Sequence, residues 1–341
     1  MAKTATSDSG PSTLSVGVFG YDGCSSWIVA GILELFELAN VLCGRLDYDA
    51  RRRLFHVRVV SAGGGAVLAS HKIQFRTLRH HGALDVLVVP PIWHTSTDDL
   101  VAALRVMQPS LAKLSALAER SRLVASACSG SVLLAEASLL EGKTATTCWW
   151  LRDWFRRRYA AVNLRPERLI VVDGATWTAA AGSAYIHLCL KIVASFGGEE
   201  LATMVAQFML VDPNRESQAP FLLPEFQESK SDELVESVRK FVFSHLDRSF
   251  GLADVASAAN VSLRTLFRRF QQLTNMTPLD FVREARIERA KRLLSQTRDS
   301  VDAIAPQCGY EDVSSFRKLF RKQVGLTPGD YRKRFGRVQA P

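Results

Sequence analysis

The chain has 341 residues, of which 47% are hydrophobic and 23% are charged, as in a soluble globular protein. Its length exceeds what a single core usually supports, so we expect two domains. The longest apolar runs, such as "DVLVVPPIW", are far shorter than the roughly 20 residues that span a bilayer, which argues against a membrane protein.

The net charge of +9 is unevenly distributed. Residues 231–341 hold 20 Lys and Arg against 13 Asp and Glu, whereas residues 1–230 hold 23 against 21. A basic last third favours a polyanionic partner such as nucleic acid. Charge alone leaves a merely solvated surface equally open.

The ends and the cysteines indicate the compartment. Residues 1–13 contain no apolar segment and are expected to form a disordered tail rather than a signal peptide. The six cysteines are scattered without a C-x-x-C pair, which favours reduced thiols in a cytoplasmic protein. We therefore expect no disulfide, no metal site and no cofactor.

Strands and helices alternate from residue 14 to about residue 196. The expected strands are apolar almost throughout, at 14–20, 55–62, 85–91, 122–128 and 168–174. The expected helices are amphipathic, at 25–42, 97–107, 110–120, 129–140 and 182–197. This alternation predicts an α/β domain in which helices cover a parallel sheet. Ligands of such sheets bind at the carboxyl ends of the strands, where Cys128 lies.

The strand pattern stops near residue 200. A further helix is expected at 200–211, and three prolines mark 212–230 as a linker. All later segments are helical, so the chain divides into an α/β domain at 14–211 and an all-α domain at 231–336.

The helical domain contains an internal repeat. Residues 255–281 match 304–331, and each copy predicts a short helix, a turn and a basic second helix. Ser262 and Asp312 stand where these second helices need N-caps. In each second helix an i, i+4 apolar pair is buried and the basic side chains point outward, as in a helix-turn-helix that enters a major groove. A plain helical bundle is the alternative.

Between the copies, residues 278–297 begin with proline and continue without a helix breaker. The predicted helix would be a stiff spacer that holds the two motifs about 34 Å apart, one turn of DNA.

These stretches, "LADVASAANVSLRTLFRRF", "TPLDFVREARIERAKRLL" and "IAPQCGYEDVSSFRKLFRKQVGLTPGDYRKRF", closely resemble the DNA-binding domain of AraC/XylS-type transcription regulators. The resemblance implies two helix-turn-helix units in successive major grooves of double-stranded operator DNA. The positions that match base-facing ones are Arg264, Thr265, Phe267, Arg268, Val313, Ser314, Arg317 and Lys318.

Arginines at these positions read guanine edges, and Phe267 or Val313 would touch thymine methyl groups. Lys322, Arg332 and Lys333 are expected phosphate contacts, which set affinity rather than sequence preference. Pro306 departs from the pattern, because proline inside a helix removes a backbone donor. We therefore expect the second unit to be kinked or weakened.

The first domain also resembles a known family. The stretches "VASACSGSVLLAEASLLEGKTATTCWW" and "VVDGATWTAAAGSAYIHLCLKIV" look like the class I glutamine amidotransferase-like (ThiJ/PfpI) superfamily, in the branch joined to an AraC-type domain. The resemblance implies a flavodoxin-like sandwich, commonly a homodimer, that senses a small metabolite. Helix 182–197 and the segment 201–210 are candidates for the dimer contact.

Cys128 occupies the turn at which hydrolases of this architecture display a nucleophile. A reactive cysteine needs a lowered pKa, a base and donors for an oxyanion. Protease-like members have a histidine where Ser129 stands, and the regulator branch has one where Cys148 stands. Pro90 and Pro91 replace glycine donors and carry no N–H. We expect no catalytic residue, and a cysteine-dependent hydrolase or glyoxalase-like enzyme is the alternative.

The predicted effector pocket lies at the carboxyl ends of the strands. The expected lining is Asp22, Cys24, Ser25, Ile92, Trp93, His94, Cys128, Ser129, Cys148 and Trp149. Trp93, Trp149 and Asp22 would form a partial cage for an amine or amino acid. Ordinary core packing of the two tryptophans is the alternative.

Together these features predict a cytoplasmic transcription regulator whose first domain is a non-catalytic sensor. The family resemblance favours an activator, which would have RNA polymerase as a partner. An architectural DNA binder without a ligand would leave the whole α/β domain unexplained.

Overall fold

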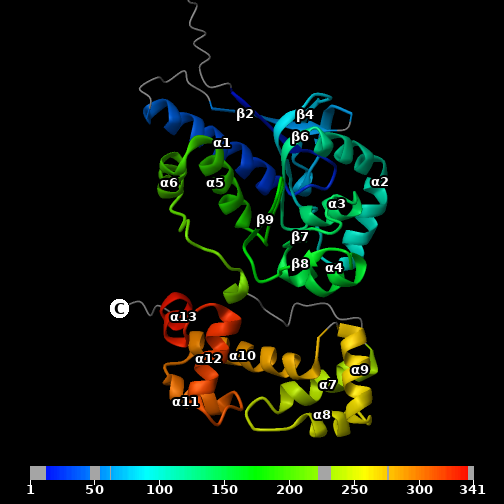
Figure 1. Cartoon of the computed structure of the whole chain (residues 1–341), viewed down its shortest axis with the longest axis vertical. Helices are drawn as coiled ribbons and strands as arrows, with labels where there is room; N and C mark the ends of the chain where they lie inside the picture. Colours follow the sequence, from blue (N-terminus) through cyan, green and yellow to red (C-terminus); the bar gives the residue numbers. More distant parts are fainter. Residues whose placement is uncertain (1–12, 47–53, 62, 222–231, 275, 337–341) are drawn as a thin grey trace, which may run out of the picture. The chain divides into compact units, whose positions relative to one another are not determined.

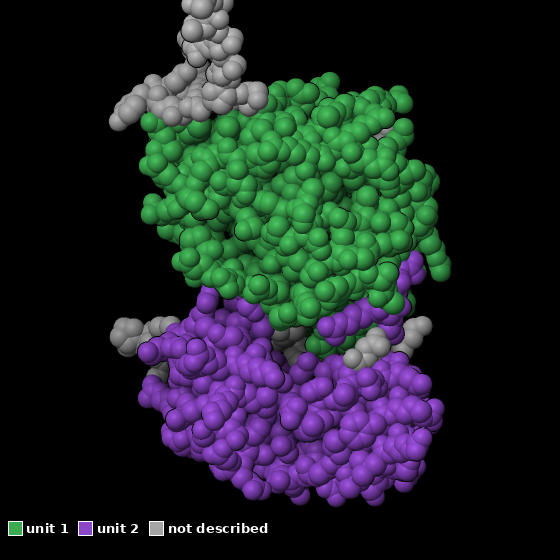
Figure 2. Space-filling model, viewed as in Figure 1, with its two compact units in different colours: residues 1–155, 159–216 green, residues 156–158, 217–341 purple. Residues whose placement is uncertain are grey.

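The computed structural model describes residues 13–46, 54–61, 63–221, 232–274 and 276–336. The chain forms two compact units, coloured separately in Figure 2. One comprises residues 1–155 and 159–216, and the other comprises residues 156–158 and 217–341. The tail at 1–12 and most of the expected linker, 222–230, lie outside the described residues.

The first unit is built on an eight-stranded mixed sheet in the order β3-β4-β2-β1-β5-β6-β10-β9. Every neighbouring pair from β4 to β10 is parallel, and the two edge strands β3 and β9 are antiparallel. The strands are β1 (Leu14–Phe19), β2 (Phe55–Ser61), β3 (Gly65–Leu68), β4 (Gln74–Arg79), β5 (Leu84–Val89), β6 (Ser121–Ala127), β9 (Ile170–Asp173) and β10 (Thr176–Ala179).

Helices cover both faces of this sheet (Figure 1). One layer contains α1 (Ser26–Leu46), α5 (Ala184–Gly197) and α6 (Glu199–Phe208), and the other contains α2 (Thr97–Glu119) and α3 (Gly130–Glu136). A short helix, α4 (Arg152–Arg158), lies in the chain between the two strands of a small sheet, β7 (Thr144–Ala145) and β8 (Asn163–Leu164). The predicted flavodoxin-like α/β sandwich is therefore confirmed.

Several elements differ from the prediction. The two helices expected at 97–107 and 110–120 are one helix, α2, which continues through Pro109. The lost backbone donor is offset because leucines on both sides of Pro109 bury one continuous stripe against the sheet. The helix expected to reach residue 140 ends at Glu136, and two residues later Ser138 has a left-handed φ of +56°.

Helix α1 is long and apolar enough to cross a membrane, with a mean hydropathy of 1.6 over its best window. In the structure it is a core helix, because Ile28, Val29, Ile32 and Phe36 are buried. The Asn40 side chain also donates to the carbonyl of Phe55 at 2.8 Å. A helix that packs on a sheet needs the same apolar residues as a helix in lipid.

From Glu233 onward, every regular element among the described residues of the second unit is a helix, in agreement with the predicted all-α domain. Its helices are α7 (Glu233–Ser244), α8 (Leu252–Ala258), α9 (Leu263–Thr274), α10 (Pro278–Gln296), α11 (Val301–Gln307), α12 (Val313–Val324) and α13 (Pro328–Phe335). They form two hydrophobic clusters, one around Leu266 and Phe270 and the other around Phe316 and Phe320.

Helix α10 joins the two clusters. It contributes Val282 and Ala285 to the first cluster and Ile287, Ala290 and Leu294 to the second. Its 19 residues correspond to a length of about 28 Å at 1.5 Å per residue. The expected stiff spacer is therefore a packed helix that both halves of the unit share.

The first part of the expected linker belongs to the α/β unit. The N–H of Leu169 donates to the carbonyl of Glu216 at 2.9 Å, and His187 Nε2 lies 3.0 Å from the carbonyl oxygen of Asp212. The chain therefore leaves the α/β unit after Glu216 rather than at residue 212.

Candidate DNA-binding surface and cysteine elbow

The first helix-turn-helix consists of α8 and α9. Its turn is closed by the N–H of Val261, which donates to the carbonyl of Ala256 at 3.0 Å, and Asn260 adopts a φ of +52°. Ser262 caps α9, because its hydroxyl accepts from the N–H of Thr265 at 3.2 Å. The predicted N-cap is confirmed.

Helix α9 buries Leu266 and Phe270 completely and turns its other face to solvent. Arg264, Phe267 and Arg268 are exposed on that face. No hydrogen bond or ion pair of the Arg264 or Arg268 guanidinium with a described residue is present, so these donors are available to DNA. Thr265 is half-buried, and its hydroxyl lies 3.0 Å from that of Ser262.

The second helix-turn-helix consists of α11 and α12 and repeats this construction. The N–H of Tyr310 donates to the carbonyl of Ala305 at 3.1 Å, and Gly309 has a φ of +73°. Asp312 caps α12 by accepting from the N–H groups of Ser314 and Ser315 at 3.1 and 2.8 Å. The second predicted N-cap is also confirmed.

Pro306 lies in the last turn of α11 and is exposed. The turn that follows it is closed by the same hydrogen bond as in the first copy. The kink or weakening expected from Pro306 is therefore not found in the turn, since the missing donor costs one hydrogen bond at a helix end.

The outward face of α12 differs from that of α9. Ser314, Arg317 and Lys318 are exposed, but Val313 is half-buried against the second cluster. Arg317 forms an ion pair with Asp302 of α11, with Nη2 and Oδ1 3.1 Å apart. Sequence reasoning missed this pair, because nothing in the local pattern relates residues fifteen positions apart on different helices.

The three expected phosphate contacts have different surroundings. Lys322 and Lys333 are exposed. Arg332 is half-buried and donates from Nε to the carbonyl of Leu294 at 3.4 Å and from Nη2 to the carbonyl of Asp299. Its guanidinium holds the end of α10, and a contact of Arg332 with phosphate stays a prediction.

In the α/β unit, Cys128 forms the expected elbow between β6 and α3. Its φ is +54°, and its N–H donates to the carbonyl of Ala179 at 3.0 Å. Gly130 permits the close approach of α3, because a Cβ there would lie 2.3 Å from the carbonyl oxygen of Val89. The strained turn is therefore locked by both neighbouring strands.

The Cys128 thiol shares its site with a second thiol. A hydrogen bond with Cys148 lowers the pKa of Cys128, aided by backbone groups of Gly182 and Ser129. Burial raises the pKa of Cys148 well above its usual value, with the same hydrogen bond as a further cause. Cys128 is therefore the more readily ionised of the pair.

His94 is occupied elsewhere. Its Nδ1 lies 2.9 Å from the carbonyl oxygen of Ile92, and its Nε2 accepts from the indole N–H of Trp150 at 3.5 Å. Both ring nitrogens of His94 are thus engaged by groups other than the Cys128 thiol. The Ser129 hydroxyl donates to the same Ile92 carbonyl at 3.1 Å.

The chain after β5 offers carbonyls instead of amide donors. The carbonyl of Pro90 accepts from the Tyr21 hydroxyl at 2.8 Å, and the carbonyl of Pro91 accepts from the N–H of Ser25 at 2.9 Å. An oxyanion needs N–H groups, so this segment cannot stabilise one. The Ser25 hydroxyl is buried and makes no hydrogen bond with a described residue.

The remaining expected pocket residues are brought together only in part. Cys24 and Ile92 form a β-bridge at the sheet edge. Asp22 accepts from the N–H of Leu68 at 2.7 Å, which ties its loop to β3. Burial of the Cys24 thiol raises its pKa.

The two tryptophans of the expected cage pack against other rings. The ring of Trp93, which is 48% exposed, packs on His71 with centroids 5.0 Å apart. The buried ring of Trp149 packs edge-on against Trp150 at 5.3 Å. Both rings thus have packing partners within the protein, and the cage around an amine stays a prediction.

Comparison with known proteins identifies both units. The model of a helix-turn-helix domain matches residues 255–334, and that of the DJ-1/PfpI family matches residues 51–195. The HTH-type transcriptional regulator CdhR of Pseudomonas aeruginosa is 30% identical over 283 residues, which cover 82% of each chain.

Two further likenesses extend over one or both units. The HTH-type transcriptional regulator GlxA of Rhizobium meliloti is 26% identical over 90% of this chain and 92% of that protein. The structure of an AraC family transcriptional regulator from Pseudomonas putida matches 57% of this chain and 99% of its own, at 18% identity and a TM-score of 0.46.

The α/β sandwich and the paired helix-turn-helix units thus define a DNA-binding transcription regulator. The chain belongs to the AraC-type regulators that carry an N-terminal DJ-1/PfpI domain.

Proposed function

We propose that α9 and α12 enter successive major grooves of the operator, with Arg264 and Arg268 as the principal base-reading residues. Phe267, Ser314, Arg317 and Lys318 complete the reading surface, and Thr265 positions the start of α9. Lys322 and Lys333 bind phosphates. The observation that supports this proposal most strongly is that both arginines of α9 are exposed and unpaired on a helix whose opposite face is buried.

The test is sequence-resolved binding by full-length protein, with an operator selected from random DNA. The double variant Arg264→Ala and Arg268→Ala should lose specific protection, at about 1–3 kcal/mol for each bidentate contact. Arg105→Ala is the matched control, because Arg105 is exposed on α2 of the other unit. An unchanged pattern of protection in the double variant would remove α9 from the interface.

For the α/β unit we propose a sensor that carries out no catalysis. The reaction of a cysteine hydrolase needs a base and an oxyanion site. Both ring nitrogens of His94 contact other groups, and Pro90 and Pro91 offer carbonyls rather than N–H donors. The small-molecule effector would bind beside Cys128, at the turn between β6 and α3. Such a ligand changes DNA binding only if it binds two arrangements of the chain with different affinity.

A cysteine-dependent enzyme is the second candidate, because Cys128 retains the strained elbow and a lowered pKa. The Cys128→Ser variant decides between the two. Loss of turnover on simple aldehydes or amides would establish the enzyme. Retained effector-dependent DNA binding with no turnover in either protein would establish the sensor.

The regulator is further proposed to be a cytoplasmic homodimer through the α/β unit, with α5 and α6 at the contact. As an activator it would recruit RNA polymerase. Analytical ultracentrifugation of the full chain tests the dimer, and transcription reconstituted with purified polymerase tests activation. A monomer, or transcription that falls on addition of the regulator, would contradict the respective proposal.

A further inference from the structure

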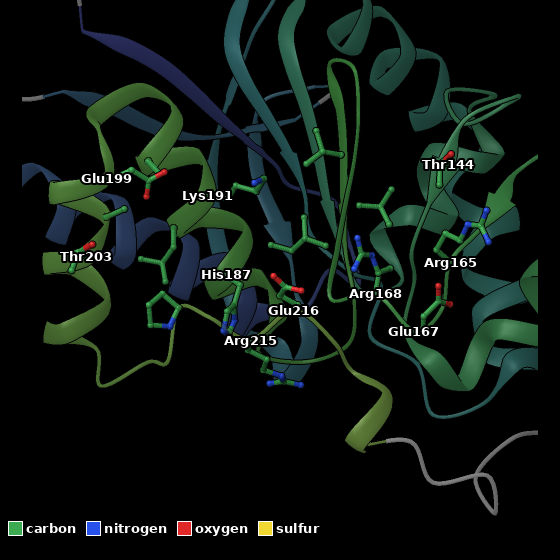
Figure 3. Close-up of a pocket in the computed structure, with 17 residues that line it drawn as sticks. Thr144, Arg165, Glu167, Arg168, His187, Lys191, Glu199, Thr203, Arg215 and Glu216 are labelled. Carbon is green, nitrogen blue, oxygen red and sulfur yellow. The ribbon is translucent and has the colours of Figure 1, made fainter. Parts of the chain in front are cut away.

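A cavity of the α/β unit lies away from the elbow. It has a volume of about 800 Å³ and is bounded by β9, α5, the start of α6 and the segment 213–216. Figure 3 shows Arg168, Lys191 and Glu216 directed toward the same space from three different elements. None of the residues assigned to the elbow lines this cavity.

Four charged groups on described residues of the cavity form no ion pair with one another. Among the described residues, the guanidinium groups of Arg165 and Arg168 and the carboxylates of Glu199 and Glu216 form no ion pair or side-chain hydrogen bond. The Lys191 ammonium lies 5.8 Å from the centroid of the Trp177 ring. Opposite charges thus face one cavity without pairing, and a ligand that carries both signs would bridge them.

The rest of the lining suits the body of a small molecule. Ile170 and Val172 of β9 and Leu190 and Ala194 of α5 supply an apolar wall. His187 is 8% exposed, and its Nδ1 is a buried atom without a hydrogen-bond partner among the described residues. A buried unpaired nitrogen is costly unless a donor or acceptor reaches it.

The segment 213–216 makes the cavity relevant to regulation. The carbonyl of Glu216 accepts from the N–H of Leu169, and the carbonyl of the preceding Asp212 lies against His187 Nε2. His187 lines the cavity, and Leu169 is adjacent in sequence to the lining residue Arg168. The same segment is the last of the α/β unit before the chain continues to the helical unit. A ligand held by Arg168 and Glu216 would fix the end of the α/β unit.

We propose that this cavity is a second ligand site, specific for a small zwitterion of the α-amino acid type. Arg168 binds the carboxylate of the ligand, and Glu216 accepts from its ammonium group. The apolar wall of β9 and α5 holds the side chain. Its effect on DNA binding rests on the sensor function proposed above, whereas the binding itself does not.

The test is isothermal titration calorimetry of the full-length protein. The probes are L-leucine, L-serine and L-glutamate, with acetate, methylammonium and inorganic phosphate as probes that carry charge of one sign only. At least one amino acid should bind saturably, and the probes of one sign should bind about tenfold more weakly, because each lacks one charge-assisted contact. Binding of none of the amino acids, or equal binding of acetate or phosphate, would overturn the assignment of a zwitterion site.

Variants locate the site. Arg168→Gln and Glu216→Gln should each weaken amino acid binding by about tenfold or more. The control Arg105→Gln should not change it. Both cavity residues are exposed, so without ligand each variant should have the same Tm as the wild-type protein.

Three outcomes would overturn the proposal while leaving the regulator intact. One is unchanged binding in both cavity variants, and another is loss of binding only in Cys128→Ser, which would place the ligand at the elbow. The third is a change of oligomeric state in Arg168→Gln without a change in binding, which would make the groove a subunit contact. Failure of the wild type to bind any selected DNA would instead refute the proposed DNA contacts.

Discussion

The two helix-turn-helix units share a scaffold but present different surfaces. Each closes its turn with one equivalent hydrogen bond, places a left-handed residue there and buries an i, i+4 pair, Leu266 with Phe270 or Phe316 with Phe320. On the outer face, however, the arginines of α9 are unpaired, while Arg317 of α12 is bound to Asp302. The buried positions define the fold, and the exposed positions define what each helix reads.

This difference suggests a division of labour between the two units. The unpaired guanidinium groups of α9 are ready for bidentate contacts with bases. On α12, Arg317 must leave Asp302, or carry it along, before it reaches DNA. We therefore expect α9 to dominate sequence preference and α12 to contribute more to affinity.

The largest expected effect concerns the shared scaffold. Phe270→Ala and Phe320→Ala should each destabilise the helical unit by about 3–5 kcal/mol, because both rings are fully buried. Phe267→Ala is the control, since that ring is 37% exposed and should cost far less. Urea unfolding of the full chain, followed by hydrogen exchange of α9 and α12, measures the change. Equal stability of all three variants would contradict the assignment of the core.

An intermediate effect is expected in the turns. Gly309→Ala should cost at least 1–2 kcal/mol, about the strain of a left-handed alanine, because its φ is +73° and the new Cβ would lie 2.8 Å from the carbonyl oxygen of Arg248. Asn260→Gly in the first copy should be neutral or slightly stabilising, since glycine adopts this conformation freely. Thermal unfolding of both variants compares the turns. A larger loss for Asn260→Gly would show that the copies differ in their turns.

The smallest expected effect concerns the ion pair on α12. Asp302→Ala should change stability by less than about 1 kcal/mol, because the Arg317–Asp302 pair is exposed. It should strengthen DNA binding and alter base preference at the positions that Arg317 reaches, since the guanidinium is released and a negative charge is removed near phosphates.

Glu311→Ala is the matched control for this variant, because Glu311 is an exposed carboxylate in the adjoining turn. It should strengthen DNA binding through the lost negative charge alone and leave base preference unchanged. Selection of bound sequences from a random pool compares the two variants. Weaker binding of Asp302→Ala would mean that the ion pair orients Arg317 for DNA rather than holding it back.

Much of the fold follows from the sequence because periodicity and repetition are local signals. The apolar strands at 14–20 and 122–128 and the repeat at 255–281 each specify their structure within a few dozen residues. Strand β10 and the pair β3 and β4 were missed, because they are short and lack a long apolar run. The sequence predicts two helices on either side of Pro109, whereas the structure has the single helix α2. The buried leucines that stabilise α2 across the proline do so by packing on the sheet, which the local sequence does not show.

For the candidate sites, the sequence predicts which residues lie on an outward helix face but not which partners those residues contact. The outward face of α9 follows from helical spacing, but the partners of Arg317 and Arg332 depend on how separate helices pack. The packing of the two tryptophans is equally unpredictable, because loop sequences do not specify which ring Trp93 or Trp149 contacts. The cavity around Arg168 draws on four segments of the chain, so no local motif marks it.

The central claim is that α10 holds two reading helices in one register along DNA. The decisive measurement is binding of the full chain to its selected operator after insertion of about half a helical turn, 5 base pairs, between the two subsites. The account predicts that the affinity falls to that of DNA with a single subsite. An insertion of a full helical turn should restore little of the affinity, because α10 is a rigid helix of fixed length. Unchanged affinity after the half-turn insertion would contradict it.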